Sequence, residues 1–99
     1  MEFGGIDWDD GNWPKCGRHG LSKEEIESFL REGTTRILSD RQHSAGEDRL
    51  LAIGRDVRGR AGIFVGFTIR MIGERMLVRP ITARYMHAKE IARYDSKQD

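Results

Sequence analysis

The sequence is poor in the residues that build disulfide frameworks and metal sites. It contains one cysteine, Cys16, with three histidines and two prolines among 99 residues. A single cysteine excludes an internal disulfide and fits a reducing compartment, and the scattered histidines have no metal-ligand spacing, so we expect no cofactor and no metal. The apolar stretches fall far short of the roughly 20 residues that cross a bilayer, and no basic-then-apolar leader is apparent. We therefore expect a cytoplasmic protein with no membrane contact.

Charge of each sign is concentrated in one half of the chain. Residues 1–48 hold 6 Lys and Arg against 11 Asp and Glu, whereas residues 49–99 hold 11 against 5. Most cations of the second half are arginines, whose planar guanidinium binds phosphate oxygens in a bidentate manner. Because five acids cannot neutralise eleven cations, we expect arginines to be available for an anionic partner such as RNA. The alternative is a solvated arginine-rich face.

Two helices are expected in the first third of the chain. Asn12 is a candidate cap for a helix that begins at Trp13. Ser22 and Glu25 form a capping box at the start of a second helix over Lys23–Glu32, where apolar residues recur at helical spacing.

The pattern then changes from a helical period to a period of two. Strands are expected over Thr35–Ser39, Asp48–Arg55, Ala61–Met71 and Arg75–Thr82, and residues 6–9 are typical of an edge strand or an extended entry. Turn glycines between the later strands predict an antiparallel sheet of about four strands in meander order. Pro80 lacks a ladder donor, which predicts an edge position or a bulge. A helix over His87–Tyr94 completes one α+β domain over residues 1–99, with an extended entry at 1–5 and a frayed tail at 95–99.

Four blocks of residues carry a family resemblance. The first is Asp7-Trp8-Asp9, Gly11-Asn12, Lys15-Cys16 and Arg18-His19-Gly20; the second is Asp40-Arg41, His43-Ser44, Glu47-Asp48-Arg49 and Ile53-Gly54-Arg55; the third is Phe67-Thr68 and Arg70; and the fourth is Arg79 to His87, Lys89-Glu90 and Tyr94. In this order and spacing they resemble the BrnT family of bacterial toxins, a branch of the RelE-like ribonucleases of type II toxin-antitoxin pairs. Thr82 stands where serine is usual in the family.

The resemblance implies both an activity and a partner. It implies a RelE-like fold and a metal-independent endoribonuclease that cleaves RNA, arrests translation and so stops growth. It also implies a ribbon-helix-helix antitoxin, joined to the toxin in a 2:2 heterotetramer that binds operator DNA through the antitoxin.

RNA cleavage without a metal needs a base for the 2′-hydroxyl, cations for the five-coordinate phosphate and an acid for the departing 5′-oxygen. Glu47 stands two positions before Arg49, so both project from one strand face, as a catalytic pair or as a salt bridge. His43, just before them, titrates near neutrality and suits proton transfer, unless it only bonds a backbone carbonyl. Arg79 and Arg84, near one sheet end, are the expected phosphate-binding pair.

Four further arginines are RNA-binding candidates. Arg55, Arg58 and Arg60 surround a turn, where they steer RNA electrostatically or keep the hairpin soluble, and Arg70 lies on the sheet face. Cys16 has cations nearby, but no partner base is evident, so we expect a buried structural thiol.

A second functional hypothesis stays open. A catalytically inactive RelE-fold binding module would act with its antitoxin as a co-repressor or RNA-binding element. The low net charge and the lack of an evident lysine-tyrosine catalytic set favour it.

Overall fold

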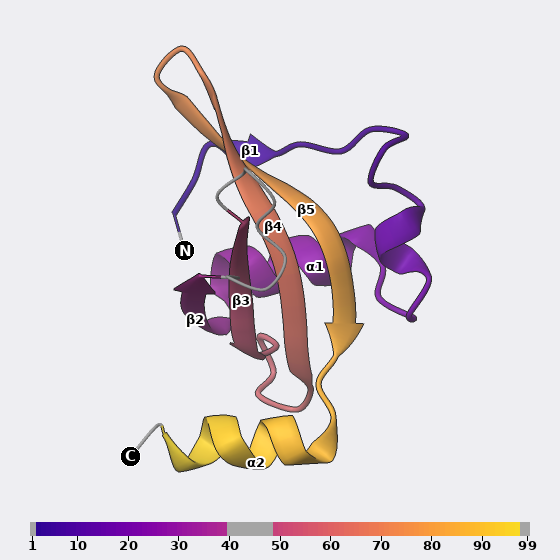
Figure 1. The fold of residues 1–99 in the computed structure, drawn as a ribbon, viewed down its shortest axis with the longest axis vertical. Helices are drawn as coiled ribbons and strands as arrows, with labels where there is room; N and C mark the ends of the chain where they lie inside the picture. Colours follow the sequence, from indigo (N-terminus) through magenta and orange to yellow (C-terminus); the bar gives the residue numbers. More distant parts are fainter. Residues whose placement is uncertain (1, 40–48, 98–99) are drawn as a thin grey trace.

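A five-stranded sheet forms the centre of the protein in the computed structural model, which describes residues 2–39 and 49–97 (Figure 1). The strands are β1 (Gly5–Ile6), β2 (Thr34–Ser39), β3 (Arg49–Arg55), β4 (Gly62–Ile72) and β5 (Arg75–Tyr85). Their order across the sheet is β1-β5-β4-β3-β2. The helical elements are the short 3-10 turn η1 (Lys15–Gly17), α1 (Lys23–Glu32) and α2 (Ala88–Ser96).

The sheet is mixed, so the expectation of four antiparallel strands is only partly right. Strands β2 to β5 are each antiparallel to their neighbour in chain order, as expected. The fifth strand, β1, lies parallel to β5, with Gly5 opposite Leu77 and Ile6 opposite Val78. Two residues carry no periodic pattern of their own, which is why the sequence did not reveal this pairing.

The expectation of two N-terminal helices is wrong for the first of them. In place of a helix from Trp13, the chain forms only η1 over Lys15–Gly17. The side-chain amide of Asn12 donates to the backbone carbonyls of Asp7 and Pro80, both at 2.9 Å, and its oxygen accepts from the backbone nitrogen of Asp9. The residue proposed as a helix cap therefore joins the loop to the sheet.

Helix α1 is confirmed together with its cap. The hydroxyl of Ser22 accepts from the backbone nitrogen of Glu25 at 3.1 Å, and the carboxylate of Glu25 accepts from the backbone nitrogen of Ser22 at 3.0 Å. The helix ends at Gly33. Its apolar side chains pack on one face of the sheet in a cluster of buried residues that includes Ile26, Phe29, Leu30, Ala52, Ile63, Val65, Phe67, Val78 and Ala83.

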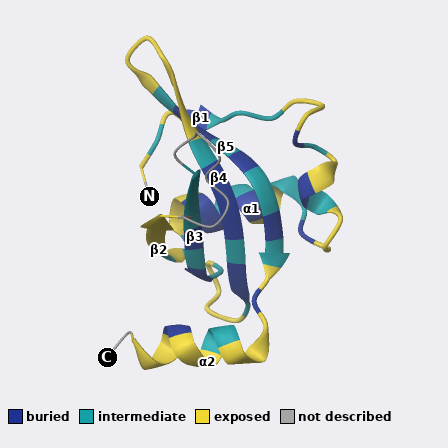
Figure 2. Ribbon diagram, viewed as in Figure 1, coloured by how far each residue is buried: buried dark blue, intermediate teal, exposed yellow. Residues whose placement is uncertain are grey.

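The two sheet faces differ in what covers them. Helix α1 lies behind the sheet in the view of Figure 1. Its buried residues and those of the central strands, dark blue in Figure 2, belong to one core cluster, so this is the face that the helix covers. The other face, which we call the open face, carries the alternate residues of each strand. Pairing across the strands places Arg49, Phe64, Gly66, Thr68, Thr82, Arg79 and Arg84 on this face.

A bulge in β5 confirms the expectation drawn from Pro80. Gly66 lies opposite Thr82 and Phe67 lies opposite Pro80, so Ile81 is an extra residue in β5. Pro80 has no backbone N–H to donate to a neighbouring strand. On this side of β5 its carbonyl accepts from the side chain of Asn12, so no strand-to-strand hydrogen bond from Pro80 is needed.

Helix α2 lies across the end of the sheet where β5 finishes (Figure 1). It begins after His87, close to the expected start, but it continues to Ser96, past the point where a frayed tail was expected. The buried hydroxyl of Tyr94 donates to the backbone carbonyl of Thr34 at 3.2 Å, which ties the helix to β2. Neither this helix nor any other among the described residues has the length and apolar character to cross a membrane.

The backbones of β2 and β3 approach each other closely at Gly54, and a substitution there tests this approach. Gly54→Ala is expected to lower the free energy of unfolding by more than about 3 kcal/mol, because the new methyl group would overlap the carbonyl oxygen of Thr34. Gly59→Ala is the control: its φ is +69° with nothing within 4 Å of the added carbon, so the expected cost is about 1 kcal/mol. Urea unfolding of both variants measures the difference, and equal losses would contradict the close approach.

Candidate functional site

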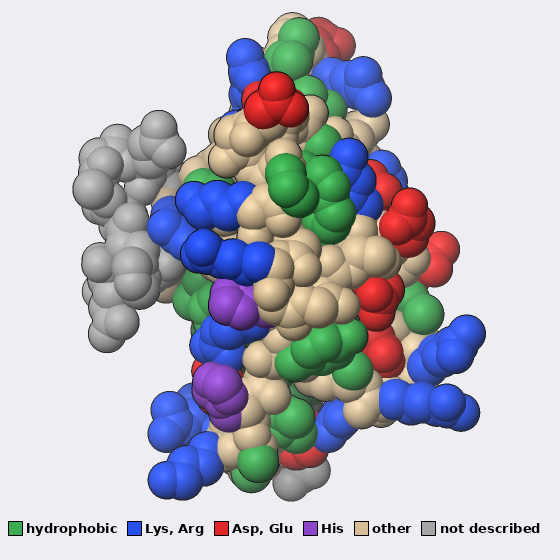
Figure 3. All heavy atoms as spheres, turned by 90° about the vertical axis from the view of Figure 1, so that its right-hand side faces the viewer, with side chains coloured by type: hydrophobic (Ala, Val, Ile, Leu, Met, Phe, Trp, Pro, Cys, Tyr) green, Lys and Arg blue, Asp and Glu red, His purple; other side chains and the backbone are tan. Residues whose placement is uncertain are grey.

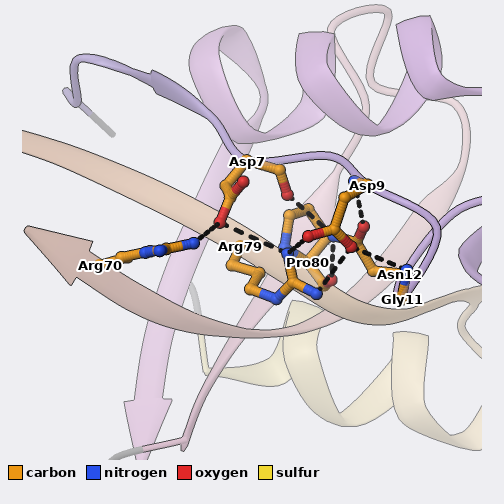
Figure 4. Close-up of polar contacts among 7 residues, drawn as sticks. All are labelled: Asp7, Asp9, Gly11, Asn12, Arg70, Arg79 and Pro80. Atoms are coloured by element: carbon orange, nitrogen blue, oxygen red, sulfur yellow. Dashed lines mark hydrogen bonds and ion pairs between the residues drawn. The ribbon is translucent and has the colours of Figure 1, made fainter. Parts of the chain in front are cut away.

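A group of acids and arginines fastens the N-terminal loop to β5 (Figure 4). Both nitrogens of the Arg79 fork donate to Asp9, each at 2.9 Å, and one of them also lies 3.4 Å from Asp7. Arg70 reaches the same Asp7 carboxylate at 3.3 Å. These hydrogen bonds, which Arg79 donates and Asp9 accepts, lower the pKa of Asp9 and raise the pKa of Arg79.

Asn12 completes this group, which we call the N-terminal clamp: Asp7, Asp9, Asn12, Arg70 and Arg79. Asn12 is only 2 % exposed, and its three hydrogen bonds join the loop backbone to the carbonyl of Pro80. A buried amide with its partners in place fixes one loop conformation, because leaving any of these polar groups unpaired is costly. The clamp therefore sets where the following turn lies against the sheet.

The turn that follows the clamp, η1, packs beside β5. Cys16 points into the core and is 1 % exposed, as expected for a structural thiol. Burial raises its pKa in spite of the nearby cations Lys15, Arg79 and Arg18. Cys16 points inward from this short turn, whereas Lys15 and Arg18, close to it in the chain, are exposed at the surface.

These surface cations form one wall of a hollow of about 370 Å³ on the open face. We call it the basic hollow, and its lining residues are Lys15, Arg18, Arg49, Phe64, Ile81, Thr82 and Arg84. Four of the seven are cationic, and none of the described residues that line it is acidic. Figure 3, which looks at the side of the molecule with η1 and β5, shows one group of Lys and Arg side chains toward its left, the open-face side. Most of the Asp and Glu side chains in this view lie toward its right, together with other Lys and Arg side chains.

Gly66 allows the floor of the basic hollow to form. A side-chain carbon at this position would lie 2.9 Å from the methyl group of Thr82 and 3.3 Å from a terminal nitrogen of Arg49. Without that carbon, the Arg49 guanidinium of β3 and the Thr82 methyl group of β5 both lie close over the backbone of β4 at Gly66.

Arg84, another lining residue of the basic hollow, is fixed by contacts with Glu90 and Phe64. Its two terminal nitrogens donate to the two oxygens of Glu90 at 2.8 and 3.0 Å, and its guanidinium stacks over the ring of Phe64 at 4.3 Å. The hydrogen bonds from Arg84 lower the pKa of Glu90 from 4.5 to about 2. The charge of Arg84 is thus largely balanced, while its position against the hollow is fixed.

The structure brings two of the predicted catalytic residues together. Arg49 and Arg84 line the same hollow, whereas Arg79 is engaged by Asp9 in the N-terminal clamp. Glu47 and His43 lie outside the described residues.

The premise that the basic half has too few acids to pair its arginines is wrong. It counted only the acids of that half, but Asp7 and Asp9 come from the first ten residues. Folding brings the two oppositely charged halves together, which the count along the chain did not anticipate.

The four predicted RNA-binding arginines are dispersed. Arg55 pairs with Asp95 of α2 at 2.6 Å, and Arg58 and Arg60 lie exposed at the turn between β3 and β4. Arg70, with its side chain 59 % exposed, lies beside Asp7 in the N-terminal clamp. None of the four lines the basic hollow.

Sequence reasoning missed Lys15 and Arg18 as site residues. It named them within the first block of the family resemblance and as cations near Cys16, but gave them no part in the site, because nothing in the local pattern shows that the loop folds back along β5. The available signal was the pair of carboxylates at Asp7 and Asp9, which has a natural partner in a strand arginine such as Arg79.

The basic hollow is suited to bind a phosphate group. Guanidinium and ammonium donors converge on one space, with a hydroxyl from Thr82 beside them, which matches the several oxygens of a phosphodiester. Among the residues that the structure describes, no group of three or more His, Cys, Asp and Glu side chains is placed to hold a metal ion.

The Arg84–Glu90 pair gives a pH-dependent test. Glu90→Gln is expected to lower the free energy of unfolding at pH 7 by about 1 to 2 kcal/mol, allowing for partial exposure of the pair. Because the pKa falls from 4.5 to about 2 on folding, the stabilisation is complete above pH 4.5 and is lost as the pH falls toward 2. Urea unfolding at pH 7, 4 and 3 should show that the free energies of unfolding of the wild type and of Glu90→Gln converge as the pH falls. Glu74→Gln, at the exposed β4–β5 turn, is the control, and a pH-independent difference would contradict the ion pair.

Comparison with known proteins identifies the family of the chain. The family model described as the ribonuclease toxin, BrnT, of type II toxin-antitoxin systems matches residues 8–90, which include the N-terminal clamp from Asp9 onward and every residue of the basic hollow. No curated protein matches the chain. The match extends over most of the chain, so the protein belongs to the BrnT family of ribonuclease toxins of type II toxin-antitoxin systems.

Proposed function

We propose that the protein is an endoribonuclease toxin that holds the scissile phosphate of RNA in the basic hollow and cleaves it without a metal ion. The observation that carries this proposal is the convergence of Lys15, Arg18, Arg49 and Arg84 on one hollow whose described lining contains no acid. A phosphodiester gains a second negative charge as it becomes five-coordinate, and cations fixed in advance stabilise that charge.

The proposed reaction is an attack within the RNA strand. A base takes the proton of the 2′-hydroxyl, and the 2′-oxygen forms a bond to the adjacent phosphorus. The bond from phosphorus to the 5′-oxygen breaks, and an acid donates a proton to that oxygen. The products are a 2′,3′-cyclic phosphate and a free 5′-hydroxyl, and no redox partner is needed.

Residue roles follow from position in the hollow. Arg49 and Arg84 both line the hollow. We assign Arg49 to the phosphate oxygens, with Lys15 and Arg18 holding the flanking strand. Because Glu90 engages both terminal nitrogens of Arg84, we assign Arg84 to shaping the wall and adding positive charge there, not to a bidentate bond with the phosphate. We assign the base and acid roles to Glu47 and His43 because they precede β3 directly, and that strand carries Arg49 into the hollow.

We assign Arg79 a different role from the phosphate binding that its position near one end of the sheet suggested. Its bidentate bond to Asp9 makes it a positioning residue, which holds the loop that carries Lys15 and Arg18. A guanidinium with both terminal nitrogens on one carboxylate has little capacity left for a phosphate.

A binding module without catalysis remains the second candidate. The observation that favours it is that Arg84 is balanced by Glu90, which leaves the hollow fewer uncompensated cations than its lining suggests. Such a module would act with the antitoxin as a co-repressor or RNA-binding element.

The antitoxin completes the proposed function. Family membership implies an antitoxin partner, and we propose that it is a ribbon-helix-helix protein. It would form a 2:2 heterotetramer with the toxin and bind operator DNA. The toxin released from this complex would cut RNA and thereby arrest translation and growth.

RNA cleavage by the purified toxin in EDTA tests the proposal directly. Arg49→Ala is expected to slow cleavage by roughly 100-fold, because a preorganised charge on the transition state is removed. Arg60→Ala, an exposed arginine away from the hollow, should change the rate less than about threefold. Circular dichroism and thermal unfolding confirm that each variant folds. RNA left intact by the wild type would favour the binding module, and cutting that stops in EDTA would refute the metal-free reaction.

A matched pair of variants tests the positioning role of Arg79. Asp9→Asn and Arg79→Gln both break the same ion pair, so both are expected to slow cleavage to a similar extent, roughly tenfold, by loosening the loop. If Arg79 instead contacts the phosphate, Arg79→Gln should abolish cleavage while Asp9→Asn keeps it. Initial rates with saturating and limiting RNA separate these outcomes.

A further inference from the structure

An apolar groove lies next to the basic hollow, between α2 and the open face of the sheet. It has a volume of about 280 Å³. Its lining residues are Arg36, Leu38, Leu51, Ile53, Phe64, Met86, Glu90, Arg93, Tyr94 and Lys97. The pairing of β2 with β3 and of β3 with β4 puts the apolar members from the sheet side by side, as a continuous floor.

The groove reaches the edge of the sheet. Within the described residues the sheet ends on this side at β2, which contributes Leu38 to the groove at 38 % exposure. Exposed apolar side chains on an edge strand mark a surface that gains from a partner.

Charge at the rim specifies the chemistry of that partner. Arg36, Arg93 and Lys97 are exposed cations around the groove. The acid among its lining residues, Glu90, is already engaged by both nitrogens of Arg84. A partner that matches this surface has apolar side chains for the floor and carboxylates for the rim.

The groove and the basic hollow share a wall. Phe64 lines both, and the bidentate pair of Arg84 and Glu90 spans from one to the other. A chain seated in the groove therefore lies directly beside the phosphate site, where an additional carboxylate would compete with RNA for the cations.

We propose that the groove is the docking site of the antitoxin, through a segment with apolar side chains flanked by Asp or Glu. This proposal rests on the proposed toxin function only for its account of inhibition, since the docking surface is defined by the groove itself. The same segment closes the basic hollow from the side of α2.

Binding of the toxin to its cognate antitoxin, encoded by the reading frame adjacent to its own, tests the proposal. We expect the Kd to rise at least tenfold in two variants, Arg93→Glu/Lys97→Glu and Leu38→Glu. The first repels the carboxylates of the antitoxin, and the second removes an apolar side chain from the floor of the groove. Arg60→Glu is the matched charge reversal outside the groove and should stay within twofold of the wild type. The altered side chains are exposed, so the variants should fold, and thermal unfolding checks this.

The salt dependence of binding and the oligomeric state of the toxin alone distinguish antitoxin docking from other uses of the groove. Raising the salt concentration should weaken the wild-type complex more than the Arg93→Glu/Lys97→Glu complex. Groove variants that bind within twofold of the wild type would overturn the proposal. So would a stable wild-type toxin dimer that Leu38→Glu dissociates, because the groove would then hold a second copy of the chain.

RNA cleavage by the free toxin keeps the two proposals distinct. Leu38→Glu and Arg93→Glu/Lys97→Glu should cleave RNA at the wild-type rate but escape inhibition by the antitoxin. A toxin that does not cleave RNA at all would refute the proposed function, while the comparison of Kd values still decides the docking site.

Discussion

The ion pair between Asp9 and Arg79 joins residues 70 positions apart, and the site depends on that junction. The carboxylate comes from a loop with little regular structure, and the guanidinium comes from the longest antiparallel pair of the sheet. Beside it, the buried amide of Asn12 fixes the loop backbone against β5. Lys15 and Arg18 follow within nine residues, so their place at the basic hollow is set by a contact in which neither takes part.

Arg84 shows how one residue serves two neighbouring surfaces. Its fork is bound to Glu90, its plane lies over Phe64, and its edge faces the basic hollow. Glu90 in turn accepts from the backbone nitrogen of His87 at the start of α2. The phosphate site and the end of the last helix are therefore mechanically linked, and a partner on α2 acts on a site that it need not enter.

Local signals in the sequence predicted the elements well, and distant contacts explain what they missed. The capping box of Ser22 and Glu25 identified α1, and the period of two identified the four antiparallel strands. An edge strand or extended entry was expected over residues 6–9, but the parallel pairing of β1 with β5 was not, because the two strands are about 70 residues apart and the two residues of β1 have no pattern. Among site residues, the sequence singled out Arg84 by its position near one end of the sheet and Arg49 by its spacing from Glu47 on one strand face. It misjudged Arg79, because the acids that engage Arg79 belong to the other half of the chain.

The burial of Cys16 has a consequence for redox chemistry. Oxidants and alkylating reagents attack the thiolate, and in this protein burial keeps the sulfur protonated and out of reach. The thiol becomes reactive when η1 leaves the core, so its modification reports detachment of the loop that carries Lys15 and Arg18. Oxidative stress thus has no direct route to this toxin through its one sulfhydryl group while the loop remains in place.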